Sequence, residues 1–229
     1  QDTTRWGRDL GLNLKDLLKQ AAQIPGVEWL RLLYCYPDET DIALIDEMAA
    51  HDNICRYLDL PLQHAAPGIL KAMNRRGSVE DIKRLLTYAR QKGFALRTTF
   101  IVGFPGETEA DFEELLHFTR DMAFDRMGAF TFSPEEDTAA AKLPNQVPEK
   151  VKKQRLERLM ALQGDISLAR NQLRVGAVER VLVTGREGGL YTGRSQWEAP
   201  DADGIIRFAA DAALTPGTFV QVRITEADT

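Results

Sequence analysis

The stretch Ile101-Val102-Gly103-Phe104-Pro105-Gly106-Glu107-Thr108 decides the fold class. A β-prone run over 94–102 ends in it, and a helix is predicted to begin at Thr108. Its two glycines permit a tight turn, and a helix start presents unpaired backbone N–H groups. The stretch therefore predicts a strand-to-helix turn that either binds a carboxylate or similar anion or simply bends the chain.

Helices and strands alternate around that turn, from residue 14 to about residue 132. We predict strands over 29–34, 57–60, 94–102 and 127–132. The apolar spacing predicts helices between them, over 14–22, 44–48, 67–73, 78–89 and 108–122, with Asn13 as a cap and a capping-box pattern at Ser78. This alternation predicts a parallel sheet, open or barrel-like, with helices outside.

The pattern changes near Pro144. A long helix is predicted from Glu149 to about Gln172, with its buried stripe formed by Leu156, Leu159, Met160, Leu162, Gln163 and Ile166. Beyond Gly176 there are only short β-like runs, over 178–184, 190–193, 205–209 and 219–224. They predict a small all-β module, most simply a barrel.

Composition excludes several classes of protein. The 229 residues include 44% hydrophobic and 28% charged residues, which is ordinary for a globular chain. No apolar run approaches the roughly 20 residues of a membrane-spanning helix. The net charge of -5 gives no overall basic field for nucleic acid, and two cysteines do not make a disulfide scaffold. Because residue 1 is Gln, we expect the chain to be a fragment of a longer protein.

Polar residues near the predicted strands are further candidates for a ligand site. Gln63 and His64 follow a strand; Gln63 could hydrogen-bond a ligand and His64 could carry a proton, although a structural role is commoner. Arg97 needs an anionic partner, such as a ligand carboxylate, if it points into a barrel, and is a surface residue if it points outward.

The all-β module is acidic. Residues 175–229 contain 5 Lys/Arg and 8 Asp/Glu, a weak argument for a protein partner over RNA. Trp197, beside Glu198 and Asp201, either anchors an interface or plugs one end of a small barrel.

Taken together, these stretches resemble the radical-SAM methylthiotransferases. The resemblance rests on residues 101–108 followed by Glu109-Ala110-Asp111-Phe112. Three further motifs point to the RimO branch rather than the MiaB branch, which acts on tRNA: Gln1-Asp2-Thr3-Thr4, Pro61-Leu62-Gln63-His64 and Tyr191-Thr192-Gly193-Arg194. MiaB-like chains typically have Gln-Asn-Val at the first place and Gln-Ser-Gly at the second.

The resemblance implies an α/β partial (β/α) radical-SAM barrel over residues 1–147, a connecting helix over 148–168 and a small all-β TRAM barrel over 169–229. It also implies a reaction, the β-methylthiolation of an aspartate in small-subunit ribosomal protein S-twelve. The implied cofactors are S-adenosylmethionine and two 4Fe-4S clusters, with an external electron donor. The two cysteines favour a reducing, cytoplasmic location, and the lack of a long apolar run predicts no membrane partner.

The resemblance also assigns residues, without identifying a catalytic one. Around S-adenosylmethionine it places Gln1, Asp2, Gln63, Arg97, Gly103, Pro105, Gly106 and Glu107. The TRAM module would present Trp197, Glu198 and Asp201 to the basic ribosomal protein.

One departure from the family is large. The Cys-x-x-x-Cys-x-x-Cys loop that holds a radical-SAM cluster is not in this sequence, and Cys35 and Cys55 match no cluster position. We expect both clusters to be held upstream of Gln1, and the fragment alone to have no cluster and no turnover. The rival hypotheses are a tRNA methylthiotransferase, a non-catalytic TRAM module that binds RNA, and an ordinary α/β-barrel enzyme without a cluster.

Overall fold

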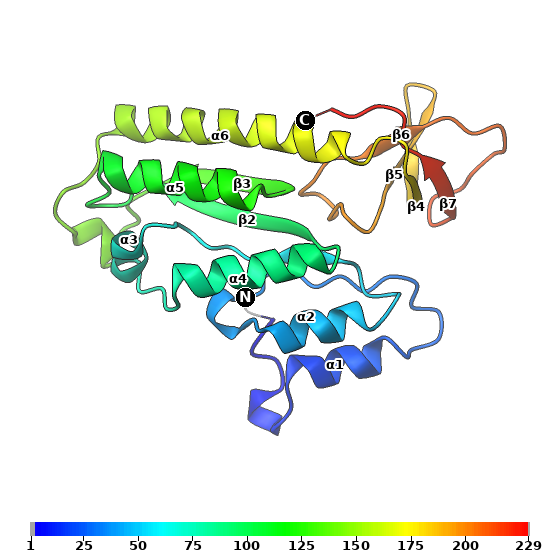
Figure 1. Ribbon diagram of the computed structural model, residues 1–229, viewed down its shortest axis with the longest axis horizontal. Coiled ribbons are helices and arrows are strands. Elements are labelled where there is room, and N and C mark those ends of the chain that lie inside the picture. Colours follow the sequence, from blue (N-terminus) through cyan, green and yellow to red (C-terminus); the bar gives the residue numbers. More distant parts are fainter. Residues whose placement is uncertain (1–2, 229) are drawn as a thin grey trace.

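A three-stranded parallel sheet organises the first two thirds of the chain. The computed structural model describes residues 3–228, so the expectations for Gln1 and Asp2 lie outside the described residues. The strands are β1 (Tyr57–Asp59), β2 (Ala95–Val102) and β3 (Arg126–Thr131), in the order β1-β2-β3 (Figure 1). Asp59 pairs with Arg97, and Arg97 pairs with Arg126. The predicted parallel sheet is confirmed.

The strand expected over 29–34 does not form as a regular strand. Leu30 makes one isolated parallel bridge with Ile54, and its N–H donates to the Asn53 carbonyl at 2.7 Å. At the other end of the segment, Tyr34 takes a left-handed conformation with φ 59. An extended ladder cannot continue through that conformation, so the segment lies beside β1 without joining it throughout.

Helices cover the sheet and carry its apolar core. They are α1 (Leu14–Ala21), α2 (Ile42–Ala49), α3 (Pro67–Ala72), α4 (Val79–Gln91), α5 (Glu109–Met122) and α6 (Glu149–Gln172). Asn13 and Thr108 each form a complete capping box, whereas the Ser78 side chain makes no cap hydrogen bond, so the capping box predicted there is wrong. Short 3-10 turns lie at Arg8–Leu10, Pro37–Glu39 and Ala140–Lys142.

The two faces of β2 differ in burial. Leu96, Phe100 and Val102 are fully covered, and the Phe100 ring meets the Phe118 and Phe124 rings edge-on at 6.4 and 5.9 Å. The alternate residues Arg97, Thr99 and Ile101 are half-buried on the opposite, inner face of the sheet. Phe130 on β3 is 62% exposed. The inner face therefore remains open to a ligand, while the outer face is core.

Helix α6 has a different buried stripe from the predicted one. Leu159 and Gln163 are buried as expected, but Met160 is 39% exposed. Lys152 and Arg155 are buried in its first half, because their charged ends reach the Phe132 carbonyl and Glu107. Long basic side chains can lie along a packed face when their charges find partners.

The C-terminal region is a curled antiparallel sheet, a half-barrel (Figure 1). Its strands are β4 (Val178–Glu187), β5 (Leu190–Arg194), β6 (Ile206–Phe208) and β7 (Phe219–Arg223), in the order β6-β5-β4-β7. Gly193 is required by close packing, since a Cβ there would lie 2.4 Å from the Val181 side chain. The apolar core of this region is small: Val181, Val183, Tyr191, Phe208 and Val222.

None of the helices within residues 3–228 combines the length and the apolar character that crossing a bilayer requires.

Candidate cofactor face and domain junction

The turn after β2 binds an anion that belongs to the chain itself. The Glu107 carboxylate accepts from the backbone N–H of Gly103 and, at 3.1 Å, from that of Phe104. Its other oxygen accepts from Arg155 at 3.1 Å, and the side chain is inaccessible to solvent. Glu107 thus occupies the N–H groups of Gly103 and Phe104, while Thr108 and Asp111 cap the helix start that was the candidate site for a ligand carboxylate.

Close packing explains why residue 103 is glycine. Its φ is +75, and a Cβ would lie 2.3 Å from the Cγ of Lys152 on α6. Gly106 also has a positive φ, of 86, but its position has open space and its N–H donates to the Asn145 carbonyl at 2.9 Å. Pro105 is buried between them. Among residues 103–107 only Gly106 is exposed, so it is the part of that stretch that a ligand can reach.

Gln63 extends the line of β1 beside β2. Its N–H donates to the Thr99 carbonyl at 2.9 Å, and its carbonyl accepts from the Ile101 N–H at 2.8 Å. These bonds hold its backbone at φ 73, a conformation that non-glycine residues rarely adopt. Strain of this kind persists where the surroundings fix it, often at ligand sites. Gln63 is half-buried, and its backbone lies opposite Phe100, bonded to Thr99 and Ile101 on either side.

His64 is buried beneath the same turn. Its Nδ1 accepts from the Ala66 N–H at 3.0 Å, so a neutral ring carries its proton on Nε2. That Nε2 lies 3.7 Å from the Glu107 carboxylate and has no hydrogen-bond partner among the described residues. His64 is 1% exposed, which places it behind the turn rather than at an open surface.

Arg97 points to the inner face and finds its anion within the chain. Its guanidinium donates to Asp59 at 2.8 Å, and its Nε lies 3.7 Å from Asp203 of the C-terminal region. Burial acts to lower the pKa of Arg97, but Asp59 outweighs it and raises the pKa. The inward alternative for Arg97 is therefore correct, with a protein carboxylate in the place proposed for a ligand's.

The loop 195–203 of the C-terminal region docks into the sheet domain. Asp203 accepts a 2.6 Å hydrogen bond from the Tyr57 hydroxyl of β1 and a 2.7 Å bond from the Ala199 N–H. Burial, with Asp203 adding to it, raises the pKa of Tyr57, so the phenol stays protonated and donates. Trp197 packs with Ala199 against Tyr57 and Ala95. Trp197 thus packs against the sheet domain rather than inside the small β-module.

Glu198 joins the two regions. Its carboxylate accepts from Arg126 of β3 at 3.1 Å, from Arg174 at 2.5 Å and from the Ser195 backbone N–H at 2.9 Å. The side chain is 2% exposed, so in this arrangement it does not face an external partner as the resemblance implied. Of the three residues assigned to substrate binding, only Asp201 is exposed.

Sequence reasoning missed Tyr57, Asp59 and Asp203. Asp59 carried a signal, since a carboxylate inside an apolar strand needs a partner and Arg97 offered one. Asp203 carried none, because its partner Tyr57 lies 146 residues away.

The described residues do not fit an iron–sulfur cluster. Cys35 and Cys55 are buried and are not joined by a disulfide. Within residues 3–228, no group of three or more His, Cys, Asp or Glu side chains is arranged to hold a metal ion. The expectation that the clusters are held upstream of Gln1 stays a prediction.

The sequence matches two domain families. Residues 7–119 match the radical SAM superfamily, and residues 175–229 match the TRAM domain. A "Ribosomal protein uS12 methylthiotransferase RimO" from Desulforudis audaxviator is 50% identical over 99% of this chain and 51% of the relative. One of the same name from Pelotomaculum thermopropionicum is 53% identical over 98% of this chain and 52% of the relative.

Solved structures agree on the fold. Coproporphyrinogen III oxidase (HemN) from Escherichia coli, a radical SAM enzyme, is similar with a TM-score of 0.52 and 20% identity, over 80% of this chain and 50% of that one. Methylornithine synthase (PylB) is similar with a TM-score of 0.50 and 15% identity, over 69% of this chain and 45% of that one. The chain spans about half the length of the curated relatives it matches. It belongs to the radical SAM superfamily, as a stretch of the RimO-type methylthiotransferases that joins part of the radical SAM domain to a TRAM domain.

Proposed function

We propose that this chain is the part of a radical-SAM methylthiotransferase that faces S-adenosylmethionine and contains the TRAM domain. The enzyme modifies ribosomal protein uS12, which is the same protein as S-twelve, at the β-carbon of an aspartate. The supporting observation is identity of 44–53% to RimO relatives across 98% or more of the chain. S-adenosylmethionine and a 4Fe-4S cluster supply the radical chemistry in this family. The second cluster, the external electron donor and the cytoplasmic location belong to this proposal.

The inner face of the sheet is the proposed wall of the S-adenosylmethionine site. Gln63 and the exposed Gly106 lie at the carboxyl ends of β1 and β2, where ligands of α/β folds bind. Arg97 contributes positive charge deeper in the face, held by Asp59. Pro105, Gly103 and Glu107 support the site from behind, since their atoms are buried in the turn.

The TRAM domain has two proposed roles. Its loop 195–203 closes the amino end of the sheet through Asp203 and Trp197. The exposed Asp201 and the acidic balance of residues 175–229 fit a basic ribosomal protein better than RNA.

The test is an activity assay on the full-length gene product. The protein, reconstituted with iron and sulfide without oxygen, is incubated with S-adenosylmethionine, a reductant and uS12 or unmodified tRNA. Mass spectrometry is expected to show one methylthio group on an aspartate of uS12. Methylthio-adenosine in tRNA with unmodified uS12 would overturn the assignment in favour of a tRNA enzyme, and modification of neither would leave the binding-module hypothesis.

A matched pair of variants tests the proposed cofactor face. Gln63→Ala is expected to raise the KM for S-adenosylmethionine roughly tenfold, because the proposed hydrogen bond from its amide to the ligand is lost. Gln91→Ala, an exposed glutamine at the end of α4, is the control and is expected to leave the KM unchanged.

A further inference from the structure

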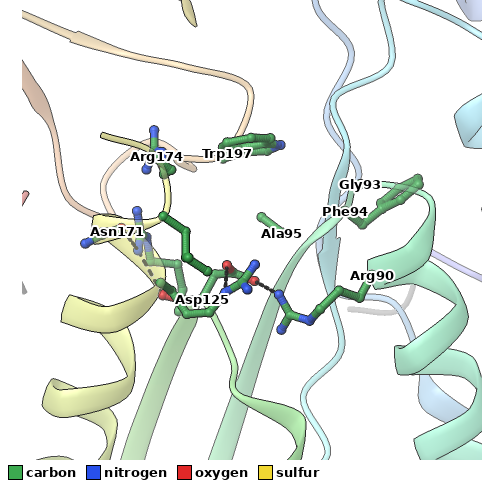
Figure 2. Close-up of a pocket in the computed structure, with 11 residues that line it drawn as sticks. Arg90, Gly93, Phe94, Ala95, Asp125, Asn171, Arg174 and Trp197 are labelled. Carbon is green, nitrogen blue, oxygen red and sulfur yellow. Dashed lines mark hydrogen bonds and ion pairs between the residues drawn. The ribbon is translucent and has the colours of Figure 1, made fainter. Parts of the chain in front are cut away.

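A cavity lies at the amino end of the sheet, the end opposite to Gln63 and Gly106. It has a volume of about 190 Å³ and is bounded by the end of α4, the starts of β2 and β3, the end of α6 and the loop of Trp197 (Figure 2). A single water needs only about 10–15 Å³ of such volume, so the cavity has room for a larger group. The proposed function places Trp197 at this end of the sheet but assigns no ligand to the cavity.

The lining of the cavity is rich in guanidinium groups. Arg90, Arg126, Arg170 and Arg174 all line it, and Asp125 is the one carboxylate that lines it among the described residues. Asp125 is shared, since Arg90 donates to one of its oxygens at 3.0 Å and Arg170 to the other at 2.8 Å. Burial lowers the pKa of Arg90 and the charge of Arg170 lowers it further, against the opposing effect of Asp125. Glu198 accepts from Arg126 and Arg174, and Glu179 from Arg174, so these four guanidinium groups face three carboxylates and one positive charge is in excess.

Three sets of hydrogen-bond donors remain available there. Arg126 Nε and Trp197 Nε1 are buried, and neither has a partner within residues 3–228. Arg170 uses only its Nε, and its side chain is 28% exposed. Buried donors without partners are rare in folded proteins, and each calls for an acceptor. Arg174, in contrast, is already occupied by Glu179 and Glu198.

We propose that this cavity is a binding site for a phosphate group. A planar carboxylate offers two oxygens, whereas a phosphate group offers three or four and can accept from donors on several sides. The donors come from β3, α6 and the TRAM loop, and therefore surround the space from three elements. Guanidinium groups bind phosphate with paired, charge-assisted hydrogen bonds. The source of the phosphate is either a small phosphate compound or an RNA backbone.

Binding is tested on the 229-residue chain, so the result does not depend on the proposed reaction. Inorganic phosphate is titrated at constant ionic strength, and binding is followed by calorimetry. Saturable binding is expected, and Arg170→Ala is expected to weaken it roughly tenfold or more, because charge-assisted hydrogen bonds are lost. Trp197→Phe keeps an aromatic ring, removes the Nε1 donor and is expected to weaken binding roughly fivefold.

Arg158→Ala is the matched control, since Arg158 lies on the same helix but pairs with Glu109 and Glu113. It is expected to bind phosphate as the wild type does. Circular dichroism identifies variants that fail to fold, and Trp197→Phe provides a second variant that removes no charge. Absence of saturable binding, or equal binding by Arg170→Ala, Trp197→Phe and the wild type, overturns the site.

A competition experiment between phosphate and RNA identifies the source of the phosphate group. A single-stranded oligouridine is added to the phosphate-loaded chain. If oligouridine displaces the bound phosphate from the wild type but not from Arg170→Ala, the site is supported and an RNA backbone is the source of its phosphate group. If phosphate binds and oligouridine does not displace it, the site is supported and a small phosphate compound is the source of the phosphate group.

Discussion

Two buried glutamates, Glu107 and Glu198, have nearly the same surroundings and opposite roles. Each accepts from backbone N–H groups close in sequence and from arginine, and each is 5% exposed or less. Glu107 binds the turn four residues before it and an arginine of α6, all within the radical SAM part. Glu198 binds Arg126 across 72 residues and thereby joins the TRAM domain to β3. One carboxylate shapes a site within a domain, and the other holds two domains together.

Replacing Glu107 is expected to have the largest effect on stability. Glu107→Ala leaves Arg155 buried without its closest anion and frees two N–H groups of the turn. Breaking a buried pair in this way costs about 3–5 kcal/mol. Urea unfolding followed by circular dichroism measures the loss. Glu109→Ala is the control, because Glu109 also pairs with Arg155 but is 58% exposed, and a comparable loss there would contradict the assignment.

Replacing Glu198 is expected to loosen the junction rather than the sheet. Glu198→Ala removes the shared partner of Arg126 and Arg174, at a cost of about 3 kcal/mol. Arg174 lies just beyond α6, so trypsin is expected to cleave after it at least about tenfold faster. Asp201→Ala is the matched control on the same loop, and equal cleavage rates in the two variants would show that Glu198 does not hold the junction.

Alanine variants at the two glycines of one turn distinguish the effect of close packing from that of backbone strain. Gly103→Ala and Gly106→Ala both place alanine at a positive φ, but only the first puts a Cβ against Lys152. Gly103→Ala is therefore expected to be less stable than Gly106→Ala by about 1–3 kcal/mol. Thermal or urea unfolding of the pair measures the difference. Equal stabilities would mean that α6 does not pack against the turn as described.

Acid is expected to weaken the junction through Glu198. Burial acts to raise the pKa of Glu198, but Arg174 and Arg126 outweigh it and keep the pKa below its ordinary value. A carboxyl with a lowered pKa stabilises the fold above its unfolded pKa, about 4.3, and loses that contribution as the pH falls through its folded pKa. The stability difference between wild type and Glu198→Gln should be constant above that pH and shrink below it. A difference that grows on acidification would reverse the sign assigned here.

The strand, turn and helix around Glu107 could be predicted from the sequence. The strand into Val102, the turn at Gly103 and the helix from Thr108 follow from periodicity, glycine and capping, which act over a few residues. The long helix Glu149–Gln172 was predicted for the same reason. The capping box at Ser78 failed because its pattern permits a bond that the folded chain does not make.

The contacts of Glu198 and Asp203 across the domain junction could not be predicted from the sequence. Nothing near Glu198 or Asp203 in the sequence indicates Arg126 or Tyr57, since those contacts exist only once both domains have folded and docked. The expected strand at 29–34 failed for a related reason, because β-propensity without a partner along its whole length does not make a ladder. The sequence motifs located the turn correctly, but they did not show that Glu107 itself occupies its N–H groups.

Hydrogen–deuterium exchange of the wild-type chain tests the central claim most directly, namely that the loop 195–203 is part of the domain junction. The Ser195 N–H donates to Glu198 and the Ala199 N–H to Asp203, so both amides are expected to exchange much more slowly than those of the exposed segment 134–138. Exchange of 195–199 as fast as in that segment would contradict the account, because the loop would then be open to solvent and to partners.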